Sequence, residues 1–355
     1  MLNKAEKERY NRQVILPELG VAGQEKLKQA KVLVIGAGGL GCPILQYLTA
    51  AGVGTIGIAD MDVVSESNLH RQILYTSEDV GKPKVRVAIQ KLTQQNPHIH
   101  FKAHPEGITT ENALDMVKLY DVLVDGSDNF PTRYLVSDAC TILQKPLVFG
   151  AISRFEGQLS VFNHKNGPSY RCLFPEPPGA GEIPNCAEAG VLGVLPGVVG
   201  TLQANEVIKI VCEIGEVASG KLLLFDALSL SFSSFKFPRT AQADKVTALQ
   251  SSYGATCAVV QTISADELKA WLAQDKQVQV LDVRELQEYE NFNIGGELVP
   301  LSKLSDKLAT LQLQPKVVVH CQSGVRSQKA IAILQERYPE VQFYNLAGGL
   351  NSWEH

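Results

Sequence analysis

The sequence predicts two α/β domains, a larger one followed by a smaller one. Two stretches carry this prediction: 31–62, where a glycine-rich turn joins two apolar strands through a helix, and 316–338, where a strand, a loop and a helix follow one another. A third observation is the polar, irregular stretch 237–253 between them. We therefore expect a first domain over 1–240, a linker over 241–258 and a second domain over 259–355.

Composition and charge limit the classes of function. Hydrophobic residues make up 45% of the 355 residues and charged residues 20%, as in soluble globular proteins. The net charge of −4 gives no reason to expect nucleic acid or an anionic membrane as a partner. The charged stretch Met1–Gln13 lacks the apolar core of a signal peptide, and the seven cysteines lack the spacing of a disulfide framework. These features predict a cytoplasmic location.

The first chemical centre is the turn after the apolar strand Val32–Ile35. Three glycines in G-x-G-x-x-G spacing follow this strand, namely Gly36, Gly38 and Gly41. A helix over 42–51 and a second strand over 55–59, which ends at Asp60, complete a βαβ unit of the nucleotide-binding type. Asp60 follows Gly41 by 19 residues and is placed to hold a ribose hydroxyl. The alternative is a turn whose glycines serve packing alone, and a dehydrogenase would show the same pattern.

Cationic and amide side chains follow this unit at the expected ligand-binding edge of the sheet. Asn68, Arg71 and Gln72 lie in one short loop, where the planar guanidinium of Arg71 matches phosphate oxygens. Lys84 begins a predicted helix that runs to about Gln95 and can bring an ammonium group to a phosphate. The alternative for these residues is a solvated loop and a solvated helix start.

Asp128 and Asn129 follow the predicted buried strand Tyr120–Asp125. A carboxylate at the carboxyl end of such a strand can bind Mg²⁺, which prefers oxygen ligands and substrate phosphates. The alternative is a helix N-cap, a common role of both residue types. The rest of the first domain is predicted as a helical start over 1–30, strands over 146–150, 158–162 and 221–226, a mobile loop over 175–190 and a long apolar helix over 193–212.

The second chemical centre is Cys321, directly after the predicted strand Lys316–His320. The thiol lies at the carboxyl end of that strand and before a helix over 327–338, so loop amides and the helix dipole favour an anionic sulfur. Arg326 adds positive charge at the rim of the loop. The alternative is an inert buried cysteine. Upstream, the stretch 262–273 contains a capping box of Ser264 and Glu267, which predicts a helix with Ser264 as its N-cap, and a strand is predicted over 278–285.

Residues 1 to about 240 resemble the E1-like adenylyltransferases of the MoeB/ThiF type. The motifs that carry the resemblance occur in the family's order: ERYNRQ, VIGAGGLG, ADMD, SNLHRQ, GKPKV, DGSDNFPTR and CAEAGV. The region from about 260 to the end resembles a rhodanese sulfurtransferase domain through LDVRE, EYE, VVVHCQSGVRS and NLAGG. The resemblance implies a Rossmann-like domain with a mixed sheet, followed by a smaller α/β rhodanese domain.

The first resemblance implies that the enzyme uses ATP and Mg²⁺ to adenylylate the C-terminal glycine of a ubiquitin-like sulfur carrier that ends in Gly-Gly, releasing pyrophosphate. Gly39 and Asp60 would contact adenosine, and Asn68 and Arg71 the phosphates, with Gln72 beside them. The same loop brings Ser67, Leu69 and His70 into the nucleotide-binding set. Lys84 would stabilise the transferred phosphoryl group, and Asp128, with Asn129 adjacent, would hold Mg²⁺. Arg12 would reach the neighbouring subunit's site, which implies a homodimer.

The second resemblance implies that Cys321 carries a persulfide and delivers sulfur to give a carrier thiocarboxylate. The sulfur donor would be a cysteine desulfurase or thiosulfate, and the carrier would belong to molybdenum cofactor or thiamin biosynthesis. Cys186, in the mobile loop, matches a family cysteine that in some relatives links to the carrier or helps to resolve an acyl disulfide. In other relatives the equivalent residue is dispensable.

The sequence departs from the family at a structural zinc site. Family members commonly bind zinc through two C-x-x-C pairs. The first position here reads Ser169-Tyr170-Arg171-Cys172, and the second pair, expected near 237–248, is absent. One cysteine does not close a four-thiolate site, so we expect no zinc.

Two competing hypotheses remain at this stage. An NAD-dependent oxidoreductase would share the glycine turn, but hydride transfer has no need for Lys84, Arg71 and Asp128 around a phosphate. A non-enzymatic scaffold would use the second domain only for docking, but it would have no need for an intact Cys321 loop.

Overall fold

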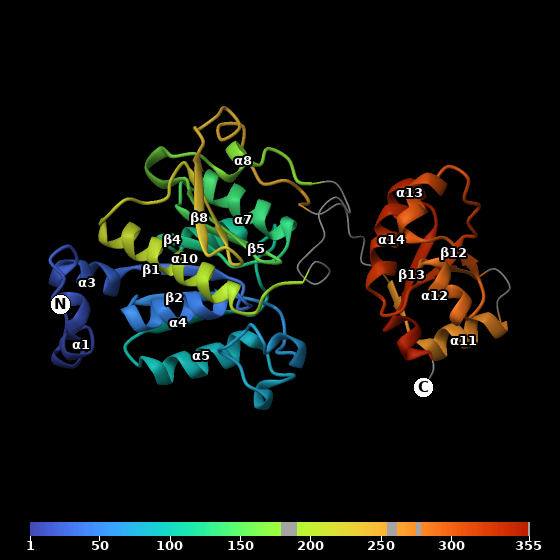
Figure 1. Ribbon diagram of the computed structural model, residues 1–355, viewed down its shortest axis with the longest axis horizontal. Helices are drawn as coiled ribbons and strands as arrows, with labels where there is room; N and C mark the ends of the chain where they lie inside the picture. The colour runs from blue at the N-terminus through green and yellow to red at the C-terminus, as the bar shows by residue number, and fades with distance from the viewer. Residues whose placement is uncertain (179–189, 254–260, 275–277, 354–355) are drawn as a thin grey trace. The chain divides into compact units, whose positions relative to one another are not determined.

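The first sheet has eight strands in the computed structural model, which describes residues 1–178, 190–253, 261–274 and 278–353 (Figure 1). Its strand order is β3-β2-β1-β4-β5-β6-β7-β8, with parallel pairing from β3 to β5 and antiparallel pairing from β5 to β8. This confirms the mixed sheet expected from the sequence. The strands are β1 (Lys31–Ile35), β2 (Thr55–Ala59), β3 (His100–His104), β4 (Val122–Asp125), β5 (Leu147–Ser153), β6 (Glu156–Phe162), β7 (Lys221–Asp226) and β8 (Ser231–Lys236).

Helices cover both faces of this sheet (Figure 1). One core contains the buried side chains of α4, α5 and α10, and the other contains those of α6 and α7. Burial on both faces explains why β1 and β4 are continuous apolar runs. In the first unit, the described α-helices are α1 (Lys4–Arg9), α2 (Asn11–Val14), α3 (Gly20–Gln29), α4 (Gly41–Ala51), α5 (Lys84–Gln95), α6 (Ala113–Lys118), α7 (Phe130–Ile142), α8 (Tyr170–Leu173) and α10 (Leu195–Cys212).

The second sheet has five parallel strands in the order β11-β10-β12-β13-β9. It has its own core, which includes the buried thiol of Cys321. The smaller α/β domain expected from the sequence is therefore present. Its elements are β9 (Gln261–Ile263), α11 (Ala265–Gln274), β10 (Val278–Asp282), α12 (Leu286–Asn291), β11 (Glu297–Leu298), α13 (Leu304–Lys307), β12 (Lys316–His320), α14 (Val325–Arg337) and β13 (Gln342–Leu346).

The boundary between the two compact units falls after Tyr253. The sequence placed a linker over 241–258, but Ala243 and Tyr253 are buried, and Leu249 packs against the core of the first unit. A few apolar side chains along this polar stretch are enough to hold it on the first unit. They form no periodic pattern, so the sequence did not predict this packing. We therefore propose that the first domain ends at Tyr253 and that the connecting segment starts at Gly254.

Several elements differ in extent from the sequence expectation. The long apolar helix begins at Leu195, and the helix after Cys321 begins at Val325. The strand that ends at Asp125 begins only at Val122. Strands β3 and β8 were not predicted, because β3 is polar and largely exposed and every residue of β8 is exposed. The expected mobile loop and Cys186 lie largely or wholly outside the described residues.

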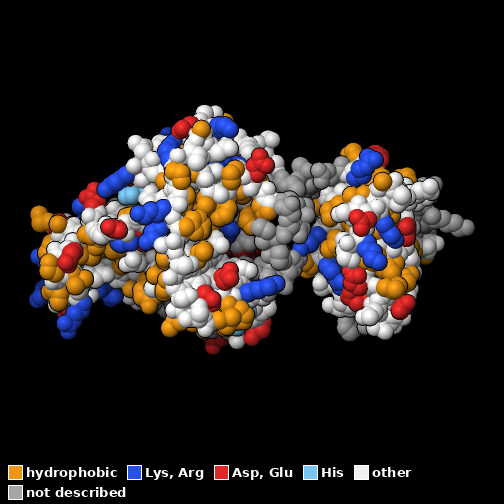
Figure 2. All heavy atoms as spheres, turned by 45° about the horizontal axis from the view of Figure 1, so that its top comes forward, with side chains coloured by type: hydrophobic (Ala, Val, Ile, Leu, Met, Phe, Trp, Pro, Cys, Tyr) orange, Lys and Arg blue, Asp and Glu red, His pale blue; other side chains and the backbone are white. Residues whose placement is uncertain are grey.

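Acidic and basic side chains are interspersed over the face shown in Figure 2. Among the helices of the described segments, none combines the length and the apolar character needed to cross a membrane.

Candidate functional site: a glycine-lined hollow and a cysteine loop

The glycine turn after β1 packs too closely for side chains. Gly36 has a φ of +88°, and a Cβ atom on Gly41 would lie 2.0 Å from the carbonyl oxygen of Gly36. Gly126, after β4, closes the other side, since a Cβ atom on Gly36 would lie 2.8 Å from its oxygen. The spacing therefore serves both close packing and a backbone surface open to a ligand.

This turn forms one wall of a hollow of about 300 Å³ at the carboxyl ends of β1, β2 and β4. The sequence-predicted residues that line it are Gly36, Gly38, Gly39, Asp60, Arg71, Gln72, Lys84, Asp128 and Asn129. Residues from five separate stretches of chain thus meet in one place, as expected for an open α/β sheet. The shared location supports a binding site, and the individual roles remain predictions.

Asp60, at the end of β2, is held by backbone amides. Its Oδ2 accepts from the N–H of Ala37 at 2.7 Å and its Oδ1 from the N–H of Asp62 at 2.8 Å. Burial raises the pKa of its carboxyl, against the lowering effect of Lys84 and these two amides. The carboxylate is therefore fixed at the edge of the hollow and can accept further hydrogen bonds, such as those from a ribose.

A short 3-10 turn, Glu66–Asn68, positions Arg71 and Gln72. The carbonyl of Asn68 accepts from the backbone N–H of both residues, at 3.0 and 2.9 Å. The guanidinium of Arg71 donates to the carbonyl of Ser67 at 3.1 Å. Gln72 is buried, and its Oε1 has no hydrogen-bond partner among the described residues. An unpaired buried acceptor at the wall of a hollow is a position where a polar ligand would bind.

Lys84, the first residue of α5, lines the hollow with its side chain. The side chain is buried, and Nζ donates to Oδ2 of Asp62 at 2.8 Å. Among the described residues, the hydrogen-bond partner of this ammonium is the exposed carboxylate of Asp62, which a phosphate group can replace.

Asp128 and Asn129 lie side by side after β4 but behave differently. The exposed Asp128 carboxylate makes no hydrogen bond or ion pair with the described part of the chain, so it is available to a cation. Asn129 caps α7, where its Oδ1 accepts from the N–H of Thr132 at 2.9 Å. The N-cap alternative is therefore correct for Asn129, and the metal role is left to Asp128 as a prediction.

Sequence reasoning missed Arg133 and Asp125. Arg133 lines the hollow one turn into α7, and its Nε lies 3.5 Å from Oδ2 of Asp125. Asp125 is buried, which raises the pKa of its carboxyl. The sequence did contain a signal for Arg133, since a side chain on the first turn of a helix points back toward the N-terminus of that helix. Arg133 therefore adds a third cation to Arg71 and Lys84.

Some predicted residues do not line the hollow. Gly41 is buried at the start of α4, while Ser67, Asn68, Leu69 and His70 form the turn that precedes Arg71. Arg12, on α2, lines a separate hollow beside α4 and α10. Within one chain, Arg12 therefore has no place at the glycine-lined hollow.

Residues of this hollow fit a magnesium-bound nucleoside triphosphate. Three cations can face phosphates, the free carboxylate of Asp128 can bind Mg²⁺, and the orphan acceptor of Gln72 can take a hydrogen bond. The glycines leave room for a ligand against the backbone. The arrangement is chemically suited to a triphosphate, whose charge these groups would balance.

Cys321 lies at the base of a tight loop between β12 and α14. Its Sγ accepts from the N–H of Gly324 at 3.2 Å, and the hydroxyl of Ser327 lies 3.5 Å from it. Burial alone would raise the pKa of the thiol, but the Ser327 hydroxyl and the amides of Ser327, Ser323 and Gly324 outweigh it and lower the pKa. The loop is therefore built to stabilise an anionic sulfur.

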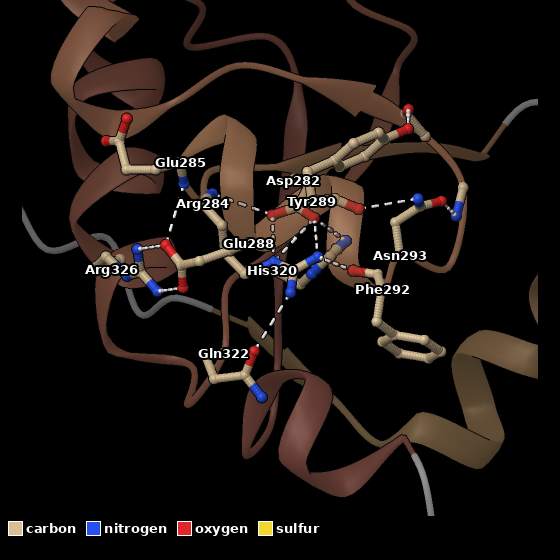
Figure 3. A network of polar contacts seen from close by, with 12 residues as sticks. Asp282, Arg284, Glu285, Glu288, Tyr289, Phe292, Asn293, His320, Gln322 and Arg326 are labelled. Carbon is tan, nitrogen blue, oxygen red and sulfur yellow. Dashed lines mark hydrogen bonds and ion pairs between the residues drawn. The ribbon is translucent and has the colours of Figure 1, made fainter.

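Arg326 does not present a free charge at the rim. Its guanidinium makes a two-point ion pair with Glu288 on α12, at 2.7 and 2.6 Å (Figure 3). This hydrogen bonding lowers the pKa of Glu288 to about 2. Arg326 therefore clamps the loop to α12, and its positive charge is balanced.

A second network, which the sequence did not reveal, holds the loop from the β10 side (Figure 3). The buried guanidinium of Arg284 pairs with Asp282 and donates from Nη1 to Oε1 of Gln322 at 3.2 Å. Gln322 in turn donates to Oδ1 of Asn351 at 2.7 Å. His320 lies buried beside Asp282, and burial lowers its pKa to about 4. The residues flanking Cys321 are thereby fixed on both sides.

Cys172 lies at the position expected for half of a zinc site. Its neighbours are the Ser169 hydroxyl at 3.5 Å and the N–H of Thr240 at 3.3 Å. The described segments contain no group of three or more cysteine, histidine or acidic residues arranged to hold a metal. The residues present at this corner do not fit a zinc ion.

Comparisons with known proteins divide the chain in the same two parts. The model of the ThiF family matches residues 10–247, and the model of the rhodanese-like domain matches residues 264–355. The "Probable adenylyltransferase/sulfurtransferase MoeZ" of Mycobacterium tuberculosis is 42% identical over 99% of this chain and 94% of its own length. The "Adenylyltransferase and sulfurtransferase MOCS3" of Mus musculus is 40% identical over 99% of this chain and 86% of its own length.

The first part has a further relative. The "Sulfur carrier protein adenylyltransferase" of Thermus thermophilus is 58% identical over 64% of this chain and 86% of its own length. Among solved structures, E. coli MccB in complex with MccA-N7isoASN aligns at a TM-score of 0.60, covering 67% of this chain and 74% of that chain at 24% identity. That structural likeness shows the fold alone.

Proposed function

We propose a two-step reaction for this chain, which belongs to the ThiF family and carries a rhodanese-like domain. The enzyme activates the C-terminus of a sulfur carrier with ATP and then converts that C-terminus to a thiocarboxylate. The chain is an adenylyltransferase joined to a sulfurtransferase. The observation that carries the proposal is the presence on one chain of a cation-lined hollow and a loop that stabilises a thiolate.

In the first step, a carboxylate oxygen of the carrier's terminal glycine attacks the α-phosphorus of ATP, and pyrophosphate leaves. Both reactants are anions, so the step needs cations and positioning more than an acid and a base. Arg71, Lys84 and Arg133 supply positive charge around the hollow, and Asp60 holds the ribose. Asp128 would hold Mg²⁺, which neutralises phosphate charge when bound.

In the second step, the terminal sulfur of a Cys321 persulfide attacks the adenylate carbonyl, and AMP leaves. The product is an acyl disulfide between the carrier and Cys321. A second thiol then attacks the Cys321 sulfur, so the carrier departs as a thiocarboxylate and a new disulfide remains for a reductant to cleave. Cys186 is the candidate for this thiol, although it lies outside the described residues.

The partners follow from this chemistry. The carrier is a ubiquitin-like protein that ends in Gly-Gly, of the molybdopterin-synthase or the thiamin type. The persulfide comes from a cysteine desulfurase or from thiosulfate. We further propose a homodimer, in which Arg12 of one subunit serves the hollow of the other, a cytoplasmic location, and a first unit that folds without zinc.

The test is carrier-dependent ATP–pyrophosphate exchange, run in parallel with a molybdopterin-type and a thiamin-type carrier. Exchange with one carrier identifies the reaction and the pathway together, and exchange with both identifies a shared activating enzyme. No exchange with either carrier, together with tight NADH binding, would overturn the proposal in favour of an oxidoreductase.

A further inference from the structure

A buried polar cluster lies on α7 of the first unit. Its centre is Asp138 on α7, and we call Asp138, Arg171 and Tyr253 the Asp138 cluster. Oδ1 of Asp138 accepts from Nε of Arg171 at 2.7 Å, and Oδ2 accepts from Nη2 at 2.9 Å. The same Oδ2 accepts from the hydroxyl of Tyr253 at 2.8 Å. All three residues are buried, so these contacts are protected from water.

The cluster ties two distant segments to α7. Arg171 also donates to the carbonyl of Pro175 at 3.0 Å and stacks on the ring of Tyr134. On the other side, the hydroxyl of Tyr253 accepts from the N–H of Gln250 at 3.2 Å. The segments that contain Arg171 and Tyr253 are therefore both held against α7 by hydrogen bonds to the Asp138 carboxylate.

Tyr253 has a second significance, because it is the last residue of the first unit. Tyr253 and Gln261, the first described residue of the second unit, are eight positions apart in the sequence. A chain of that length spans at most about 28 Å, whatever its conformation. Upstream, Leu249 is the next residue packed on the core, and its twelve positions to Gln261 would allow roughly 42 Å.

We propose that Tyr253 is a positioning residue for sulfur transfer, because it fixes the point from which the chain runs to the rhodanese domain. This inference rests on the proposed function, in which Cys321 must meet an adenylate formed by the first unit. Release of Tyr253 lengthens the tether. For a tether that already spans the distance between the two sites, the effective concentration of Cys321 at the adenylate falls with roughly the −3/2 power of tether length. If Leu249 or Thr240 becomes the last residue held on the first unit, the effective concentration of Cys321 at the adenylate falls about two- to fourfold.

The experiment compares full-length wild-type protein with Tyr253→Phe, which removes only the hydroxyl. Three rates are measured: carrier-dependent ATP–pyrophosphate exchange, persulfide formation from thiosulfate, and thiocarboxylate formation from thiosulfate in the presence of a thiol reductant. The first two rates should stay unchanged, and the third should fall about two- to fourfold. An unchanged third rate would overturn the proposal.

Two controls separate positioning from general damage. Tyr120→Phe removes another buried hydroxyl of the first unit, which lies 2.7 Å from His104 and far from Tyr253 in the sequence, and it should leave all three rates unchanged. Sulfide attacks the adenylate carbonyl directly and displaces AMP, so it yields thiocarboxylate without Cys321. Tyr253→Phe should match wild type with sulfide, and a fall there would mean damage to the adenylation site and would overturn the proposal.

Hydrogen exchange tests the anchor without any carrier. The amide of Gln250 should exchange faster in Tyr253→Phe than in wild type, because its acceptor is lost. Unchanged exchange would overturn the proposed anchor. If wild type itself forms no adenylate, the proposed function fails, while this exchange experiment still decides whether Tyr253 holds the segment.

Discussion

The ammonium of Lys84 lies 2.8 Å from Oδ2 of Asp62, and the two partners differ sharply in exposure. The lysine side chain is 6% exposed, whereas the aspartate side chain is 64% exposed. Burial fixes the cation in the hollow, while its partner remains in contact with water. In the proposed nucleotide complex, a phosphate group would take the place of Asp62 beside Lys84.

The change Asp62→Asn should strengthen ATP binding. It removes an anion that competes for Lys84. An ion pair with one exposed partner contributes about 0.5 to 1 kcal/mol, or roughly two- to fivefold in affinity. The measurement is the KM for ATP in carrier-dependent pyrophosphate exchange. Asp115→Asn, an exposed acid on α6, is the matched control. An unchanged or higher KM would show that Asp62 assists the nucleotide instead.

The two activities should separate by mutation. Asp128→Ala is expected to reduce adenylation by at least about a hundredfold, because the Mg²⁺ ligand is lost, and to leave sulfur transfer from thiosulfate to cyanide intact. Cys321→Ala is expected to abolish the second activity and spare the first. Both assays are run on the same protein preparations. If either change removed both activities from folded protein, the division between two sites would be wrong.

Ser327→Ala should raise the pKa of Cys321. The hydroxyl of Ser327 is the leading hydrogen-bond contributor to the lowered pKa of this thiol, so its loss should move the pKa upward. The thiolate fraction at pH 7 would then fall. The measurement is the pH dependence of persulfide formation from thiosulfate in a single turnover. Ser323→Ala alters an exposed side chain of the same loop and should leave the profile in place.

The rhodanese domain should lose stability between pH 6.5 and pH 4. Burial lowers the pKa of His320 to about 4 from its ordinary 6.5, beside Asp282 and Arg284. Within that window the unfolded chain binds more protons than the folded chain, so acid favours unfolding. At pH 5 the free energy of unfolding should be about 2 kcal/mol below its value at pH 8.

Tryptophan fluorescence reports this transition selectively, because Trp271 and Trp353, the two tryptophans of the chain, belong to the second domain. Urea unfolding at several pH values gives the free energies. In His320→Phe the loss between pH 6.5 and pH 5 should vanish, since no ring remains to bind a proton. The contribution of Glu288, whose pKa is about 2 in the folded state, is lost as the pH falls below the ordinary value of 4.5, and therefore outside the interval from pH 6.5 to pH 5. An equal slope in the variant would assign the effect to another group.

The sequence was sufficient for the elements with a strong local signal. The glycine spacing predicts the turn at Gly36 because only glycine fits there, and the capping box predicts the start of α11 because Ser264 and Glu267 bond to each other. Lys84 and Asp128 could be placed near one hollow because the carboxyl ends of parallel strands meet at one edge.

Features that depend on distant partners were beyond the sequence. The charge of Arg326 is balanced by Glu288, 38 positions away, and no local pattern announces that pair. Asp125 looks like the end of an apolar strand until Arg133 is seen beside it. Strand β8 is recognisable only by its pairing with β7, since its side chains are all exposed.

The contact between Asp138 and Tyr253 has a consequence for the order of folding during synthesis. Tyr253 contributes the last side chain of the core around α7, and it lies more than a hundred residues after this helix, to which it is hydrogen-bonded. The first unit can therefore close its hydrophobic core only after the ribosome has released Tyr253, when translation of the second domain is already under way. A nascent chain that stops shortly before this residue would expose apolar surface around α7, which makes such truncated products natural targets for chaperones and proteases.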